Sequence, residues 1–181
     1  MQTYQLVPHP SHPPLAVARV EARMISASNN WLRVRWRVDG VSKLIVPPFA
    51  GKGRADNLWQ STCFELFMQP DGASGYSEFN LSPSERWAAY DFTGVREGMT
   101  ERRFEREPTC TMRTGMAMAI FDAELPRAQM PDPPCMMGFA AVLEEQGGVK
   151  SYWALAHGNP DQPDFHDPAC FTAEFARTRA A

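Results

Sequence analysis

The most constraining feature of this sequence is an alternation of apolar and polar residues over Leu32 to Asp39. Leucine, valine, tryptophan and valine occupy one phase, and three arginines with an aspartate occupy the other. Successive side chains of a β-strand point to opposite faces, so the pattern predicts a strand with one buried and one wet face. Such half-buried strands are typical of antiparallel sheets. The arginines indicate a solvated sheet face or a protected edge.

Further segments of strand length follow along the chain, separated by clusters of Pro, Gly, Asp, Asn and Ser that predict turns. We expect strands at 17–24, 58–68, 76–81, 87–92, 109–121, 136–143, 151–156 and 171–176. Asp39-Gly40 predicts a hairpin turn into a partner strand at 41–46, and the charged segment 96–107 predicts a short helix or a wide loop. Amphipathic helical spacing of useful length is absent. The predicted fold class is therefore all-β, an antiparallel β-sandwich of jelly-roll type.

The length of 181 residues predicts a single domain. Residues 1–16 contain four prolines and two histidines, and we expect an extended lead-in without regular structure there. The domain is then expected to span 17–181. Eighteen Lys and Arg against 21 Asp and Glu give a net charge of −3, so nothing in the composition indicates a nucleic-acid-binding protein.

Location and oligomeric state are expected from what the sequence lacks. Neither a signal peptide nor an apolar run long enough for a membrane span is present, which predicts a soluble, cytoplasmic protein, monomeric or weakly oligomeric. The four cysteines form no CxxC metal or redox motif, and without a secretion signal we expect reduced thiols. Cys63 and Cys110 lie in apolar runs, which predicts that they pack as small hydrophobic side chains.

Several motifs carry a resemblance to a known family. These are DNLWQSTCFELF at 56–67, YSEFNLSPS at 76–84, WAAY at 87–90, SYWALAH at 151–157 and PDFHD at 163–167. Together they resemble a bacterial DOMON-like branch related to family 9 carbohydrate-binding modules, over residues 17–176. The resemblance implies a β-sandwich that binds a small ligand, typically a sugar and in some DOMON relatives haem.

The predicted hairpin of strands 62–68 and 76–82 places several polar residues on one sheet face. If Phe67 lies opposite Tyr76, Glu65 lies opposite Glu78; a slip of two residues places Glu65 opposite Asn80 instead. Either register keeps all five side chains on the same face, because side chains alternate along a strand. Two neighbouring carboxylates require compensation. An arginine such as Arg54, a cation, a shared proton or ligand hydroxyls could supply it.

Aromatic and histidine residues extend this candidate site. Trp59 follows a polar loop at 49–57 and is either a platform for a sugar ring or a core residue, whereas the phases of Trp36 and Trp153 favour the core. His157 ends a strand. His166 lies in a loop rich in aspartate, which favours an Asp-oriented imidazole that hydrogen-bonds a ligand over a metal site, because the usual metal-ligand spacings are missing.

The leading hypothesis is non-catalytic binding of a small polar ligand, a carbohydrate or sugar-derived metabolite. The proposed ligand-binding residues are Arg54, Trp59, Glu65, Tyr76, Glu78, Asn80, His157 and His166. We assign no catalytic residue, metal or cofactor: no GxSxG motif occurs, and Met112, Met116 and Met118 share one strand phase, which favours core filling over haem ligation.

Two other function classes stay open. One is an enzyme on the same scaffold that uses Glu65 with Glu78, or His166 with Asp164, as acid and base groups. The other is an interaction module that uses the arginine-striped sheet. A concave pocket with tryptophan and carboxylates favours ligand binding or catalysis, whereas a flat apolar patch favours the interaction module.

Overall fold

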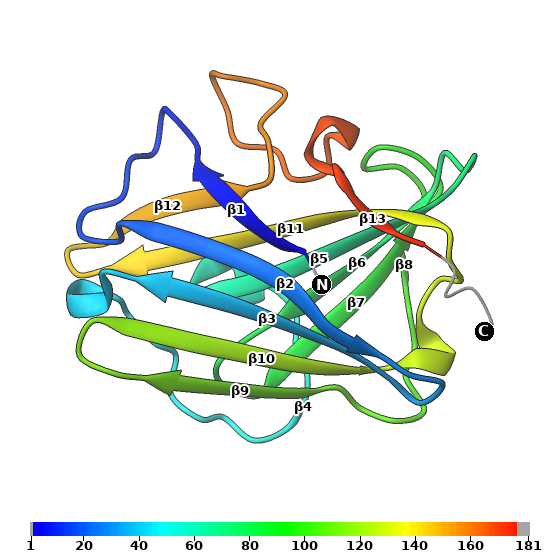
Figure 1. Cartoon of the computed structure of the whole chain (residues 1–181), viewed down its shortest axis with the longest axis horizontal. Coiled ribbons are helices and arrows are strands. Elements are labelled where there is room, and N and C mark those ends of the chain that lie inside the picture. Colours follow the sequence, from blue (N-terminus) through cyan, green and yellow to red (C-terminus); the bar gives the residue numbers. More distant parts are fainter. Residues whose placement is uncertain (1, 177–181) are drawn as a thin grey trace.

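The computed structural model describes residues 2–176, whose regular structure consists of strands and four single-turn 3-10 helices, which confirms the all-β prediction (Figure 1). The strands are β1 (Thr3–Pro8), β2 (Arg19–Ala27), β3 (Trp31–Asp39), β4 (Gly53–Arg54), β5 (Cys63–Pro70), β6 (Tyr76–Leu81), β7 (Arg86–Phe92), β8 (Thr100–Glu101), β9 (Thr109–Thr114), β10 (Met118–Pro126), β11 (Cys135–Glu145), β12 (Val149–Ala154) and β13 (Ala173–Phe175). The 3-10 helices are η1 (Val41–Lys43), η2 (Leu58–Gln60), η3 (Arg127–Gln129) and η4 (Pro168–Cys170). Residues 177–181 of the predicted domain lie outside the described part.

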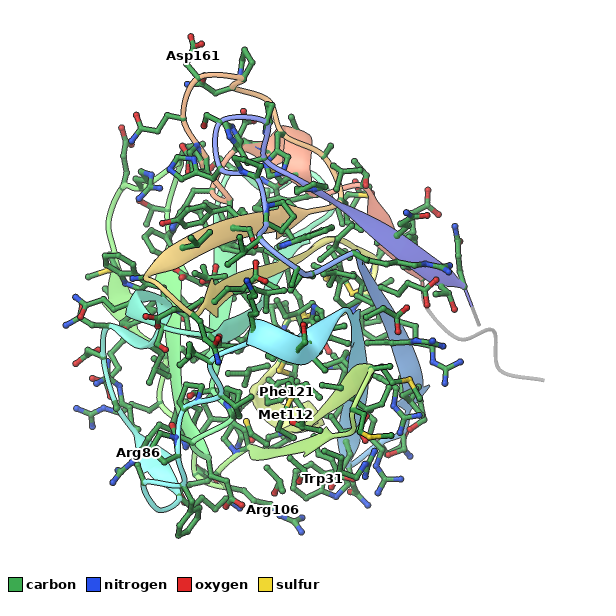
Figure 2. The ribbon with its side chains drawn as sticks, turned by 90° about the vertical axis from the view of Figure 1, so that its left-hand side faces the viewer. Trp31, Arg86, Arg106, Met112, Phe121 and Asp161 are labelled. Carbon is green, nitrogen blue, oxygen red and sulfur yellow. The ribbon has the colours of Figure 1, made fainter. Side chains whose placement is uncertain are left out.

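The strands form one strongly curled sheet in the order β4-β7-β6-β5-β11-β12-β1-β2-β3-β10-β9, with β13 on β11 and β8 on β7. All pairs are antiparallel except β4 with β7, which is parallel. The two halves of the sheet face each other across the core: Phe64 of β5 stacks on Phe121 of β10 at a centroid distance of 4.3 Å. Figure 2 places Phe121 and Met112 inside the molecule, between the two halves.

Strand β3 confirms the alternation read from the sequence. Its apolar residues, from Leu32 to Val38, are fully buried. Its arginines lie on the outer face and pair with acidic residues, including Arg35 with Asp122 of β10 at 2.6 Å and Arg33 with Glu124 at 2.8 Å. This face is therefore occupied by ion pairs with partly exposed partners, each contributing little stability. Cys63 and Cys110 are buried as predicted.

Two expectations for the chain around β3 are wrong. Residues 1–16 are not an unstructured lead-in, because β1 pairs with β2 and β12 and buries Leu6 in the core. Residues 41–46 do not return as a hairpin strand, because β2 and β10 already occupy both sides of β3. Gly40 does turn the chain, with φ of 86°, but it leads into η1.

The segment 109–121 is also not a single strand. A tight turn at Gly115, whose N–H donates to the carbonyl of Met118, divides it into β9 and β10. The turn changes the phase, so Met116 is 98% exposed and Met118 is 43% exposed, and the expectation that both fill the core is wrong. Residues 96–107 form a wide loop that contains only β8, and Arg106 there covers Trp31 at 4.1 Å (Figure 2).

Candidate functional site

The hairpin of β5 and β6 adopts the register with the two-residue slip. Glu65 lies opposite Asn80 and Phe67 opposite Glu78, so the register with Glu65 opposite Glu78 is wrong. The alternate phase, with Phe64, Leu66 and Phe79, is fully buried in the core. Glu65, Glu78 and Asn80 therefore share the face of the sheet that points away from the core, as expected from the alternation.

A cavity of about 1100 Å³ opens on this face. Its floor consists of strand residues from β5, β6, β7, β11 and β12, namely Glu65, Glu78, Asn80, Tyr90, Phe92, Val142 and Tyr152. Four segments that connect the longer strands, including β4, η2 and β8, supply the walls. Their lining residues are His12, Arg54, Asp56, Asn57, Trp59, Arg96, Met99, Glu101, Gln162, Pro163, Phe165 and His166. The loop with Gln162 projects furthest above the sheet at Asp161 (Figure 2).

Two carboxyl groups lie on the floor of the cavity. Glu65 is 4% exposed and Glu78 is 7% exposed. Burial, and then the charge of Glu78, raise the pKa of Glu65 well above its ordinary value. Burial also raises the pKa of Glu78, although a hydrogen bond from Asn80 Nδ2 to Glu78 Oε1 at 2.7 Å opposes that shift. The pair therefore retains a proton on Glu65 more readily than an exposed pair would.

His166 closes one end of the floor through a chain of hydrogen bonds. The backbone N–H of Arg96 donates to Tyr76 Oη at 3.2 Å, and Tyr76 Oη lies 2.6 Å from His166 Nδ1. Because a carboxyl oxygen faces Nε2 and accepts hydrogen bonds, we assign the hydroxyl proton of Tyr76 to Nδ1 and the ring proton to Nε2. That atom lies 3.7 Å from Glu78 Oε2. Tyr76 thus orients the imidazole, whereas Asp164 accepts from the backbone N–H of His166, so the expected orientation by aspartate is wrong.

His166 should remain neutral at pH 6. Burial, followed by the charge of Arg96, lowers its pKa to about 4. The contact with Glu78 is consequently not an ion pair at neutral pH, despite its short distance. Nitrogen-detected NMR of the imidazole should show a neutral ring protonated on Nε2 at pH 6, and a charged ring at that pH would contradict this assignment.

Arg54 does not compensate the floor carboxyls, contrary to one expectation from the sequence. Its guanidinium binds Asp56 with two hydrogen bonds of 2.7 and 3.0 Å, and its Nε lies 3.3 Å from Glu101. Asp56 also accepts the hydroxyl of Tyr90, and these hydrogen bonds lower the pKa of Asp56. Arg54 is therefore part of a charged wall that is already neutralised by its own partners.

Trp59 lies in η2 on the wall of the cavity and is 50% exposed. This exposure excludes the core alternative, and the platform role stays a prediction. Trp36, Trp87 and Trp153 are buried in the core instead.

Not all predicted site residues come together. Arg54, Trp59, Glu65, Glu78, Asn80 and His166 line the cavity, and Tyr76 lies directly behind His166. His157 is separate: its Nε2 donates to the carbonyl of Val7 at 3.0 Å and its ring packs 4.8 Å from His9. The strand β12 ends at Ala154, so His157 falls in the loop beside β1 and not above the floor.

Sequence reasoning missed several wall and floor residues. Tyr90 of β7 lies opposite Glu78 of β6. Because paired residues of neighbouring strands share a sheet face, pairing these two strands in the sequence would have identified Tyr90 as a floor residue. Arg96, His12 and Phe165 come from loops without a periodic pattern. Arg96 adopts a left-handed backbone with φ of 58°, a conformation that non-glycine residues rarely take and that often accompanies functional sites.

Two arrangements are absent from the described part of the chain. Within residues 2–176, no group of three or more His, Cys, Asp or Glu side chains is arranged to hold a metal ion. No helical segment in the same part of the chain is long and apolar enough to cross a membrane.

Comparisons with known proteins bear on the fold. The sequence matches no protein-family model, and no curated protein is significantly similar to it. A protein from Bacteroides uniformis, provisionally named a carbohydrate-binding protein, superposes with a TM-score of 0.68 at 15% identity, covering 94% of this chain and 84% of that one. A family 9 carbohydrate-binding module from Caldicellulosiruptor kristjanssonii, in complex with glucose, gives 0.51 at 12% identity over 98% and 87%. A module of the same family from that organism, in complex with cellotriose, gives 0.50 at 12% identity over 93% and 80%.

Identities this low establish the fold alone, and the DOMON-like branch stays a prediction. Both kinds of neighbour align over most of their own length and over most of this chain. The chain therefore has a fold related to that of the family 9 carbohydrate-binding modules.

Proposed function

We propose that this chain binds a carbohydrate in the cavity above β5 and β6, without chemically changing it. The observation that carries the proposal is the position of an exposed tryptophan beside a floor of buried hydrogen-bonding groups. A sugar ring has apolar C–H faces and polar edges. Trp59 offers a flat apolar surface to the face, while Glu65, Glu78 and Asn80 offer hydrogen-bond partners to the edge.

The size of the cavity and the fold support this assignment. A volume of about 1100 Å³ lies at the upper end of the range of small-molecule sites and accommodates a short oligosaccharide. Two neighbouring folds are bound to glucose and to cellotriose. We take the scaffold to be a jelly-roll sandwich of the DOMON-like branch, acting in the cytoplasm as a monomer or weak oligomer.

The test is a thermal-shift screen over mono- and oligosaccharides, nucleotides and peptides, followed by calorimetric titration of the hits. A ligand that binds only the native state at one hundred times its Kd stabilises that state by roughly 2.7 kcal/mol. Saturable binding of at least one saccharide is expected. A screen in which only nucleotides or peptides bind would contradict the proposal.

Replacing Trp59 by alanine should weaken saccharide binding by about 10-fold, because the stacking surface is lost. The free energy of unfolding should fall by less than about 1 kcal/mol, since the side chain is half exposed. Trp31→Ala is the matched control, because Trp31 packs under Arg106 and does not line the cavity. Titration calorimetry and urea denaturation measure the two effects. Unchanged affinity in Trp59→Ala would contradict the platform role.

Acid–base catalysis is the second candidate function. The observation in its favour is the approach of His166 Nε2 to Glu78 Oε2, beside a second carboxyl whose pKa is raised. The alternative pair is less favourable, because Asp164 bonds the guanidinium of Arg96 and the backbone of His166 rather than the imidazole. Oligosaccharides that bind should be recovered intact after prolonged incubation. If the wild-type protein turns over a saccharide and Glu78→Gln abolishes this turnover, the function is catalysis and not binding alone.

A further inference from the structure

We infer that the saccharide bound in this cavity carries a protonated amine, which the floor residues Glu65, Glu78 and Asn80 receive. The inference rests on the proposed function and specifies the class of sugar: an amino sugar whose nitrogen is not acylated. Three observations on residues 2–176 support it, namely the hydrogen-bonding character of the floor, the pairing of the arginines that line the cavity, and the lack of a metal-binding arrangement.

The atoms available on the floor are hydrogen-bond acceptors. Asn80 lines the cavity, is 2% exposed, and its buried Oδ1 receives no hydrogen bond from residues 2–176. Its Nδ2 already donates a hydrogen bond to Glu78 Oε1. No side chain or backbone N–H in the described part donates to the carboxyl of Glu65. A buried acceptor without a donor is costly, so a ligand that supplies donors here gains more than one that supplies acceptors.

The cations around the floor already have partners. Arg96 binds Asp164 Oδ1 at 2.7 Å, and Arg54 binds Asp56 and approaches Glu101. His166 faces Glu78 but carries no charge at neutral pH, because its pKa is about 4. Within residues 2–176 the cavity thus presents Glu65 and Glu78 without a paired positive charge. Because burial retains a proton on Glu65, a bound ammonium group takes the place of that proton, and Glu65 ionises when the ligand binds. Charge complementarity favours a cationic group on the ligand at this point.

An ammonium group fits these acceptors better than a metal ion does. It presents three N–H donors in a compact volume, which matches two carboxyl groups and one amide oxygen. Calcium needs six to eight oxygen ligands in typical sites. His166 lies beside Glu78, but within the part of the chain that the structure describes no three His, Cys, Asp or Glu side chains are arranged to hold a metal ion.

The experiment compares matched sugars by titration calorimetry at pH 6.0, where an amine with a pKa near 8 is protonated. The amines are glucosamine, galactosamine and 6-amino-6-deoxyglucose, each paired with its neutral parent hexose, and N-acetylglucosamine is the acylated control. At least one free amine should bind about 10-fold more tightly than its parent sugar. In Glu65→Gln this advantage should disappear, so that the free amine and its parent sugar bind this variant equally.

Glu101→Gln is the control for a general negative field, because Glu101 lines the cavity beside Arg54 and away from the floor pair. It should retain the preference for the amine. Parent and amino sugars that bind equally would overturn the amine inference and leave carbohydrate binding intact. If no saccharide of either form binds, both proposals fail. Calcium chloride that saturates the site at millimolar concentration and displaces the amino sugar would also overturn the inference.

Discussion

Replacing Glu145 by alanine is expected to lower the free energy of unfolding by about 3–4 kcal/mol. The Glu145 carboxyl is fully buried and accepts three successive backbone N–H groups. The donors are those of Leu15 and Ala16 at 2.6 Å and of Val17 at 3.1 Å. Removing the carboxylate leaves these N–H groups without an acceptor, and each charge-assisted hydrogen bond contributes roughly 1.5–3 kcal/mol.

The loss of the Glu145 carboxyl should also disturb the wall of the cavity. The three N–H groups fix the connection between β1 and β2, and the same connection places His12 on the cavity wall, with its ring 5.0 Å from that of Tyr152. Urea denaturation measures the stability, and Glu174→Ala, an exposed residue of β13, is the control with an expected change within about 0.5 kcal/mol. Equal stability of both variants would show that the N–H groups find other acceptors.

The sequence predicted those parts of the molecule that depend on local alternation. The bounds of β6 were predicted without error, and the sharing of one face by Glu65, Glu78 and Asn80 followed from the period of two. Register could not be predicted, because a slip of two residues keeps every side chain on its face. The hairpin adopts the register slipped by two residues, in which Glu65 lies opposite Asn80. Glu65 and Glu78 are then not directly opposite each other, and like-charge repulsion is reduced.

Other features depended on contacts between distant segments. No local pattern shows that β1 pairs with both β2 and β12, or that Glu145 binds residues 15–17. The same holds for the wall of the cavity, where Tyr76 and His166 meet although 90 residues separate them. Tryptophan burial was predictable where the strand phase was clear, as for Trp36. It stayed open for Trp59, which lies in a 3-10 turn outside any strand.

Replacing Glu65 by glutamine is expected to stabilise the protein at pH 8, although the same change removes a proposed ligand contact. Burial raises the pKa of Glu65 in the folded state above its unfolded value near 4.3. Below about pH 4 both states are protonated, so the residue makes no difference to stability. As the pH rises, the unfolded chain loses this proton while the folded protein retains it, and stability falls until the pH exceeds the folded pKa. Each unit of difference in pKa corresponds to about 1.4 kcal/mol.

Glutamine cannot ionise, so the variant avoids this loss. Wild type and Glu65→Gln should therefore have equal stability near pH 4 and should diverge with rising pH, with the variant the more stable. His166, whose pKa is about 4, titrates in both proteins, so the difference between the two curves reports Glu65 together with its effect on the neighbouring carboxyl of Glu78. Denaturation at pH 4, 6 and 8 provides the measurement, with exposed Glu105→Gln as the control. A difference that does not change with pH would mean that Glu65 is ionised in the folded protein, compensated by groups around it. A variant that gains stability while it loses its preference for an amine would identify Glu65 as a residue retained for binding at a cost to folding.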